Sequence, residues 1–377
     1  MKLTFVYGSW ACGPRPFDFT RIYHDPRGLT GSEISFLSFA KELAFRGHSV
    51  RIFAPLVSCP AEGHLWDGIR VFPISMWTDD RGEGSDFVLS WNEPDQLRYA
   101  SLKAIRIINQ QLNDFTYCKP GFESFVDIFT SPCSAHLAHM TQVYGSAHKW
   151  TVLPNGCDPT VYPTMDRIPG RILYASSPDR GLHWLLQQWP LIKRRVPDAT
   201  LRVFYNFDDW ANNLLGCDGQ GHHPHIRECA YRAYYIREAF VRLKNQGVEH
   251  FKSISRVRMA EEMASAIVLA YPCDTVTYTE GFSATLMEAC AAGLIPVTAK
   301  VDSLGCVYGD WVETMVESPV REHLNEWTEM VIRSLTDEDY RKRITAKSRA
   351  LAEQHSWSKL TDRLEQIFQT ALIRRQS

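Results

Sequence analysis

Two carboxylates and the start of a helix lie within one short segment of the C-terminal half of the chain. Glu280 and Glu288 are separated by seven residues, and Ser283 stands between them, directly before the helix formers Ala284 to Ala292. Ser283 is a favourable N-cap, and Gly293 is a typical residue at a helix end. A helix start suits a phosphate, and carboxylates accept hydrogen bonds from hydroxyls. The segment therefore fits a ligand with a diphosphate between a sugar and a ribose.

The flanking residues predict how this segment is held. Ala266 to Tyr271 is apolar and indicates a buried strand, and Leu294 to Thr298 indicates another. The polar loop Pro272 to Thr279 leads from the first strand to Glu280. We therefore expect a strand, loop, helix and strand, with the helix starting at the end of a sheet strand.

The same alternation opens the chain. Leu3 to Tyr7 predicts a strand, and His48 to Ala54 predicts the next one. Between them, Thr30 and Glu33 fit a capping box at the start of a helix that ends near Arg46. This strand–helix–strand unit is typical of a doubly wound α/β domain.

Further strands and helices are expected along the whole chain. A second alternating series begins at Arg171 to Tyr174, and Asp208 to Glu228 is expected to be irregular. The other expected strands are Ile69 to Ile74, Phe87 to Ser90, Ile105 to Asn109, Ile128 to Thr130, Thr151 to Pro154 and Thr200 to Tyr205, and the other expected helices are Leu182 to Arg195, about Cys229 to Asn245 and the amphipathic end from Trp357.

Composition limits the function classes. A length of 377 residues with 45% hydrophobic residues suffices for two globular domains. The formal net charge of −2 gives no general attraction to nucleic acid, so no nucleic-acid partner is expected. No apolar run approaches the length of a membrane span. The ten cysteines form no C-x-x-C pair, which is typical of reduced core residues, and we expect a cytoplasmic protein.

The segment Thr279 to Gly293 resembles the donor-binding motif of GT-B glycosyltransferases, specifically glycosyltransferase family 4. In that family, two glutamates separated by seven residues hold the donor sugar and the nucleotide ribose. The resemblance implies that Glu280 faces the donor sugar and Glu288 the ribose. It also implies that the backbone at Gly281, Phe282 and Ser283 meets the sugar and the phosphates.

Two further segments resemble phosphate-binding parts of this family. Thr30 and Gly31 occupy the place of a glycine-rich loop that usually has two glycines, and Thr30 replaces the first. Arg180-Gly181 matches a Lys-Gly pair that neutralises the diphosphate, and arginine keeps this chemistry because it can bind phosphate bidentately. A separate upstream arginine of the family has no match here, which leaves Arg180 as the main charge, with Ser176 as a candidate hydroxyl donor.

Other matches concern the link between domains and the donor sugar. Asn155-Gly156-Cys157-Asp158 resembles the family's interdomain Asn-Gly-Val-Asp segment. Many relatives carry a histidine near the sugar's 6-hydroxyl, and Asn113 or Asp114 takes its place here. An Asx turn after a strand explains these two residues equally well.

The resemblance implies a GT-B fold: two Rossmann-like domains facing across a cleft, with the last helix crossing back to the first domain. The expected domains are residues 1–155 with the helix 357–377, and residues 156–356. The implied reaction is transfer of a sugar, with retention, from a nucleotide diphosphosugar to a glycan, lipid-linked or small-molecule acceptor. No cofactor and no divalent metal are expected. The nucleotide, the sugar and a transient membrane association stay open.

Three alternatives remain at this point. A nucleotide-sugar 2-epimerase shares the fold, and a non-catalytic binder could have kept it. A dinucleotide oxidoreductase is disfavoured because the residues after the first strand lack the G-x-G-x-x-G pattern. A metal site is likewise disfavoured, because its candidate ligands fit no standard zinc spacing: Asp208, Asp209, Cys217, His222, His223, His225 and Cys229.

Overall fold

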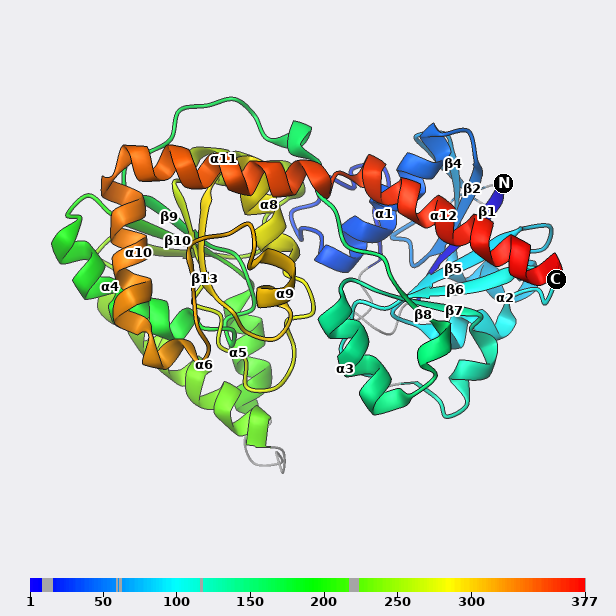
Figure 1. Ribbon diagram of the computed structural model, residues 1–377, viewed down its shortest axis with the longest axis horizontal. Helices are drawn as coiled ribbons and strands as arrows, with labels where there is room; N and C mark the ends of the chain where they lie inside the picture. Colours follow the sequence, from blue (N-terminus) through cyan, green and yellow to red (C-terminus); the bar gives the residue numbers. More distant parts are fainter. Residues whose placement is uncertain (9–15, 59, 61–62, 116–117, 217–223, 377) are drawn as a thin grey trace. The chain divides into compact units, whose positions relative to one another are not determined.

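The computed structural model describes residues 1–8, 16–58, 60, 63–115, 118–216 and 224–376 (Figure 1). It divides into two compact units. The N-terminal unit comprises Met1–Asp25, Leu29–Gly156 and His355–Ser377, and the C-terminal unit comprises Pro26–Gly28 and Cys157–Gln354.

The N-terminal unit is built on a sheet in the order β3-β4-β2-β1-β5-β6-β7-β8, counted over the described residues. Every neighbouring pair is parallel except β3 and β4. The strand order reverses between β1 and β5, as in doubly wound folds. The strands are β1 Lys2–Tyr7, β2 Ser49–Ala54, β3 His64–Trp66, β4 Ile69–Pro73, β5 Phe87–Trp91, β6 Ile105–Asn109, β7 Ile128–Ser131 and β8 Trp150–Val152.

Helices cover this sheet through apolar contacts. The helices are α1 Gly31–Phe45, α2 Trp77–Asp80, α3 Ser134–Tyr144 and the C-terminal α12 Trp357–Gln376. Thr30 and Glu33 form the expected capping box at the start of α1. The last helix, α12, packs on α1, and its Phe368 stacks on Phe87 of β5. Both chain ends therefore belong to this unit.

The C-terminal unit has a second sheet, parallel throughout, in the order β11-β10-β9-β12-β13-β14, again over the described residues. Its order reverses between β9 and β12. The strands are β9 Arg171–Tyr174, β10 Thr200–Phe204, β11 Val248–Phe251, β12 Val268–Ala270, β13 Ile295–Ala299 and β14 Met315–Val316. Both sheets confirm the expected α/β class with two Rossmann-like domains.

Helices pack around this second sheet, and one expectation about them is wrong. The stretch expected to be irregular contains α5, and α6 begins at Pro224, five residues earlier than expected. Phe207 and Ala211, one turn apart, are buried, so packing of this apolar face overrides the weak helix propensity of its Asp and Asn residues. The helices are α4 Leu182–Arg195, α5 Phe207–Gly216, α6 Pro224–Leu243, α7 Arg256–Ser265, α8 Ala284–Ala292, α9 Leu304–Tyr308, α10 Leu324–Thr336 and α11 Glu338–Gln354.

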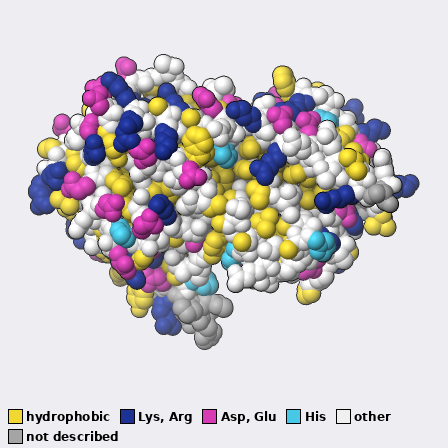
Figure 2. All heavy atoms as spheres, viewed as in Figure 1, with side chains coloured by type: hydrophobic (Ala, Val, Ile, Leu, Met, Phe, Trp, Pro, Cys, Tyr) yellow, Lys and Arg dark blue, Asp and Glu magenta, His cyan; other side chains and the backbone are white. Residues whose placement is uncertain are grey.

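Acidic and basic side chains are interspersed on the face drawn in Figure 2, notably over α10 and α11. This mixture agrees with the small net charge of the chain. None of the helices in the described part of the chain combines the length and the hydrophobicity needed to span a membrane.

Candidate functional site

The predicted donor residues lie at the point where the strand order of the second sheet reverses. Ser176 to Gly181 follow β9, and Glu280 to Ser283 belong to the connection after β12. Because β9 and β12 are parallel neighbours, their carboxyl ends meet at one edge of the sheet. In open α/β sheets, ligands bind outside the carboxyl ends of the strands at such a reversal.

The two loops touch each other closely at Gly181. This residue has φ +103°, and a Cβ there would lie 1.8 Å from the carbonyl oxygen of Pro272. Only glycine fits that approach. From α6, Arg232 donates from Nη1 to the carbonyl oxygen of Asp179 at 2.6 Å and also to that of Asp274. The sheet and α6 thus fix the loops against each other.

The carboxylate of Glu280 accepts several hydrogen bonds at this edge of the sheet. Its side chain is 4% exposed, and both of its carboxylate oxygens are engaged. Arg180 Nη1 donates to Oε2 at 2.8 Å, the hydroxyl of Tyr271 donates to the same oxygen, and the N–H of Ser283 donates to Oε1 at 2.7 Å. One carboxylate therefore joins the arginine to the start of α8.

Arg180 is held as a cation with unused donors. Burial disfavours its charge, but the attraction of Glu280 outweighs burial and raises the pKa of Arg180 well above its usual value. Its Nε is buried and has no hydrogen-bond partner among the described residues. A buried donor without an acceptor is costly, and a phosphate oxygen would satisfy it.

The start of α8 differs in one respect from the expectation. Ser283 occupies the N-cap position, but its φ is +48° and its side chain makes no capping hydrogen bond, so the expected hydroxyl cap is wrong. Its N–H turns to Glu280 instead. The N–H groups of Ala284 and Thr285 have no acceptor in the part of the chain that the structure describes. They remain available to an anion.

Neighbouring side chains shape the loop before α8. Asp302 Oδ2 accepts from the N–H groups of Thr279 and Glu280, both at 2.9 Å. The hydroxyl of Tyr308 lies 3.0 Å and 2.8 Å from the carbonyl oxygens of Phe282 and Ser283. The sequence alone did not single out Asp302 or Tyr308, because both lie beyond the end of the motif at Gly293.

Glu288 lies inside α8 and is paired. It is 6% exposed, and its Oε1 forms an ion pair with Nη1 of Arg256 at the start of α7. Burial opposes the charge of Arg256, but Glu288 and Tyr162 raise its pKa. Glu288 is therefore a buried anion with a fixed orientation and not a solvated helix residue.

The remaining predicted residue of this unit, Ser176, is half-buried, and its hydroxyl has no hydrogen-bond partner among the described residues. Thr285 Oγ1 donates to the carbonyl oxygen of Ala175 at 3.0 Å and so ties the first turn of α8 to the end of β9. The structure thus brings Ser176, Arg180, Glu280 and Ser283 to one edge of one sheet.

The other predicted residues belong to the N-terminal unit. Thr30 and Gly31 form the start of α1. Asn113 and Asp114 lie in the loop after β6, where Nε2 of His139 donates to the carbonyl oxygen of Asn113 at 3.1 Å.

Buried amides position that loop. Asn92 Oδ1 accepts from the N–H groups of Gln111 and Leu112 at 2.6 and 3.1 Å. Gln111 Nε2 also donates to Oδ1 of Asn155 at 2.8 Å. The fully buried His136 donates from Nε2 to the carbonyl oxygen of Leu112 at 3.1 Å, and burial lowers its pKa to about 4. From its helix position alone, His136 was expected to be a surface or partly packed residue, and its full burial beneath this loop corrects that expectation.

The candidate metal ligands do not form a site among the described residues. No group of three or more His, Cys, Asp or Glu side chains there could hold a metal ion. Asp208 and Asp209 lie in the first turn of α5, and His225 and Cys229 lie in α6. Cys217, His222 and His223 lie outside the described residues.

Comparisons with known proteins agree with this geometry. The family model for glycosyl transferases group 1 matches residues 175–351, most of the C-terminal unit. No curated protein sequence matches the chain. The matched region begins at the end of β9 and contains all of the predicted donor residues of this unit. Together with the fold, it supports a glycosyltransferase.

Solved structures share the architecture over nearly the full length. HepE from Anabaena, in complex with UDP and glucose, has a TM-score of 0.65 and 15% identity, covering 98% of this chain and 100% of that one. Sucrose-phosphate synthase from Thermosynechococcus elongatus has a TM-score of 0.68 and 12% identity, and the match covers 99% of this chain and 100% of that one. AviGT4, involved in avilamycin A biosynthesis, has a TM-score of 0.65 and 15% identity, and the match covers 99% of this chain and 98% of that one. The fold is therefore that of GT-B glycosyltransferases.

Proposed function

We propose that the protein is a retaining glycosyltransferase that moves a sugar from a nucleotide diphosphosugar to an acceptor hydroxyl. The observation that carries this proposal is the bridge formed by Glu280 between Arg180 and the start of α8. It places a guanidinium with an unused buried donor beside two free helix N–H groups. This is the arrangement that a diphosphate requires.

Catalysis depends on where negative charge develops as the sugar is transferred. When the bond between the sugar C1 and the diphosphate oxygen breaks, negative charge develops on the leaving diphosphate. Arg180 and the N–H groups of Ala284 and Thr285 stabilise that charge, and they are already oriented before the reaction. The acceptor oxygen attacks C1 from the same face, and its proton passes to the leaving phosphate. This route retains the anomeric configuration without a protein nucleophile.

The two glutamates bind and orient the donor. The carboxylate of Glu280 has room for about four hydrogen bonds, and three are made within the protein. One lone pair is left for a sugar hydroxyl. Glu288, fixed by Arg256, accepts from the ribose hydroxyls. In this scheme Arg180 supplies the positive charge, so the reaction needs no divalent metal.

We propose one class of donor to test first and three classes of acceptor. HepE is a structural relative described with UDP and with UDP-glucose, so UDP-sugars are the first donors to test. We propose acceptors among glycans, lipid-linked sugars and small metabolites. In the N-terminal unit, Thr30, Gly31, Asn113 and Asp114 stay proposed donor contacts.

A thermal-shift panel tests the function directly. The shift in unfolding temperature is measured for the native protein and for the Glu288→Ala variant with each of five ligand classes: UDP-, GDP-, ADP-, CMP- and dTDP-sugars. At about 100 times the dissociation constant, a ligand adds about 2.7 kcal/mol of stability. Stabilisation by one nucleotide class, lost in the variant, supports the donor site. Stabilisation by a nicotinamide dinucleotide alone overturns the proposal. Consumption of the donor without an acceptor, giving an isomerised sugar nucleotide, identifies a 2-epimerase instead.

A further inference from the structure

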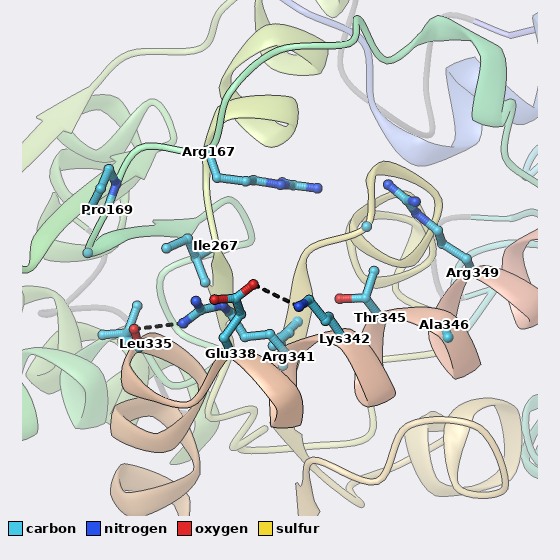
Figure 3. Close-up of a pocket in the computed structure, with 13 residues that line it drawn as sticks. Arg167, Pro169, Ile267, Leu335, Glu338, Arg341, Lys342, Thr345, Ala346 and Arg349 are labelled. Atoms are coloured by element: carbon cyan, nitrogen blue, oxygen red, sulfur yellow. Dashed lines mark hydrogen bonds and ion pairs between the residues drawn. The ribbon is translucent and has the colours of Figure 1, made fainter.

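A cavity lies at the edge of this sheet opposite to the predicted donor residues (Figure 3). Its volume is about 600 Å³, which is in the range of small-molecule sites. Gly170, Ile267 and Ile295 line it, and these residues stand at the amino ends of β9, β12 and β13. The donor residues follow the carboxyl ends of β9 and β12, so this amino-edge cavity is a separate place in the unit.

Positive charge is concentrated in the amino-edge cavity. Its lining contains four cationic side chains, Arg167, Arg341, Lys342 and Arg349, and a single carboxylate, Glu338. Glu338 pairs with Lys342 at 2.8 Å, and both are largely exposed. Glu338 also attracts Arg341, so Arg167 and Arg349 are the two arginines that face the cavity without a carboxylate partner in its lining. The chain as a whole carries a net charge of −2, so this excess is local.

Arg167 is partly buried and faces another cation. It donates to the carbonyl oxygens of Met263, Ala266 and Ala292, at the ends of α7 and α8. These bonds use three of its five N–H groups. Burial and the nearby charge of Arg349 lower the pKa of Arg167 to about 10. Figure 3 shows the two guanidinium groups pointing toward each other. An anion between them would relieve their repulsion.

The other two arginines also have donors to spare. Arg341 donates from Nη1 to the carbonyl oxygen of Leu335 at 2.9 Å, at the end of α10, and its other nitrogens have no acceptor among the described residues. Arg349 makes no hydrogen bond within the described chain. Its guanidinium lies over Gly293, where a Cβ would come within 2.5 Å of Nη2. Glycine at this position thus leaves room for the guanidinium.

We propose that the amino-edge cavity binds a small organic phosphate, separate from the donor site. Convergent guanidinium groups bind phosphate oxygens through paired N–H donors. The lining also contains the apolar residues Pro169, Ile267, Ile295 and Leu335, which can contact a carbon skeleton. This combination suits a phosphate ester such as a sugar phosphate better than inorganic phosphate alone.

The test uses inorganic phosphate, glucose 6-phosphate as a representative ester, and glucose as the uncharged control. Binding is measured by calorimetry and thermal shift at constant ionic strength. The cavity variant is Arg341→Gln with Arg349→Gln, because Arg167 also supports two helix ends. The control is Arg195→Gln with Arg333→Gln, which removes two exposed arginines paired at 3.1 and 3.2 Å with Glu329 and Asp337.

The proposal predicts saturable binding of glucose 6-phosphate, tighter than of inorganic phosphate, and none of glucose. The cavity variant should bind glucose 6-phosphate at least about tenfold more weakly, since it loses charge-assisted hydrogen bonds. The control variant and Arg180→Ala should bind as the native protein does. Absence of binding, or equal affinity in the cavity variant, overturns the proposal. Loss of binding in Arg180→Ala also overturns it, because the phosphate then occupies the donor site.

Discussion

Arg180 and Glu280, a hundred residues apart in the chain, form an ion pair with Nη1 2.8 Å from Oε2. The pair leaves Nε of Arg180 buried without a partner, while the second carboxylate oxygen holds the N–H of Ser283. Glu280 therefore orients the arginine and the start of α8 toward the same ligand. The role assigned to each group can be tested separately.

Replacing Arg180 with alanine should impair the chemical step. The variant loses a preorganised donor to the leaving diphosphate, so we expect kcat/KM to fall by the equivalent of about 2–4 kcal/mol. Arg180→Lys keeps a charge near Glu280 and should recover part of the loss. Steady-state kinetics with the donor found in the panel measure both. A near-normal rate for Arg180→Ala would contradict the role.

Gly181 should tolerate no side chain. At φ +103° a Cβ would collide with the carbonyl oxygen of Pro272, so Gly181→Ala must push the two donor loops apart. We expect a loss of about 1–3 kcal/mol in stability and weaker nucleotide binding. Gly216→Ala in α5, where no atom lies within 4 Å of the added Cβ, is the control for the space argument and should lower neither quantity. Equal behaviour of the two variants would refute the packing argument.

The contributions of Arg256 and Glu288 to the free energy of unfolding should depend strongly on each other. Arg256→Met leaves a buried carboxylate unpaired, so the free energy of unfolding should fall by about 3–5 kcal/mol. The double variant Arg256→Met, Glu288→Leu should be closer to the native protein in stability but should still bind nucleotide poorly. Chemical denaturation and calorimetry measure the two effects. If Glu288→Ala binds nucleotide normally, the carboxylate has only a structural role.

Stability of the N-terminal unit should depend on pH through His136. Burial lowers the pKa of His136 to about 4, whereas an unfolded histidine has about 6.5. The unfolded state therefore binds more protons between these values, and stability is lost as pH falls from about 6.5 to 4. The full effect is about 3 kcal/mol. Denaturation curves at pH 7, 6 and 5 measure it.

The control for this prediction is His136→Gln, which can still donate to the carbonyl oxygen of Leu112. Its stability should depend less on pH than that of the native protein. His183 in the C-terminal unit, whose pKa burial lowers to about 3, remains in the variant and gives a residual slope. An unchanged slope in His136→Gln would rule out His136 as the source.

Local sequence signals predicted the repeating strands and helices well. The capping box of Thr30 and Glu33, and the helix Ala284–Ala292 before Gly293, depend on neighbouring residues and were found with their bounds. The helix α5 was missed because its Asp and Asn residues obscured the apolar ones, of which Phe207 and Ala211 are buried and Trp210 and Leu214 pack against the core.

The site was predictable only in part, for a physical reason. Glu280, Glu288 and Arg180 were singled out because short motifs contain them. Their partners lie outside these motifs, and the spacing of the motifs does not encode them: Tyr271 and Asp302 bind Glu280, and Arg256 binds Glu288. The hydroxyl cap expected of Ser283 is absent because the residue adopts φ +48° and not the extended conformation of a capping serine.

The central claim is that Arg180 and the start of α8 bind the phosphate of the donor that leaves. Calorimetry of nucleoside mono- and diphosphates with the native protein, Arg180→Ala and Glu288→Ala tests it most directly. The native protein should prefer the diphosphate by about tenfold or more, since the second phosphate adds charge-assisted hydrogen bonds. Arg180→Ala should lose this preference, and Glu288→Ala should weaken both ligands while keeping it. An undiminished preference in Arg180→Ala would contradict the account.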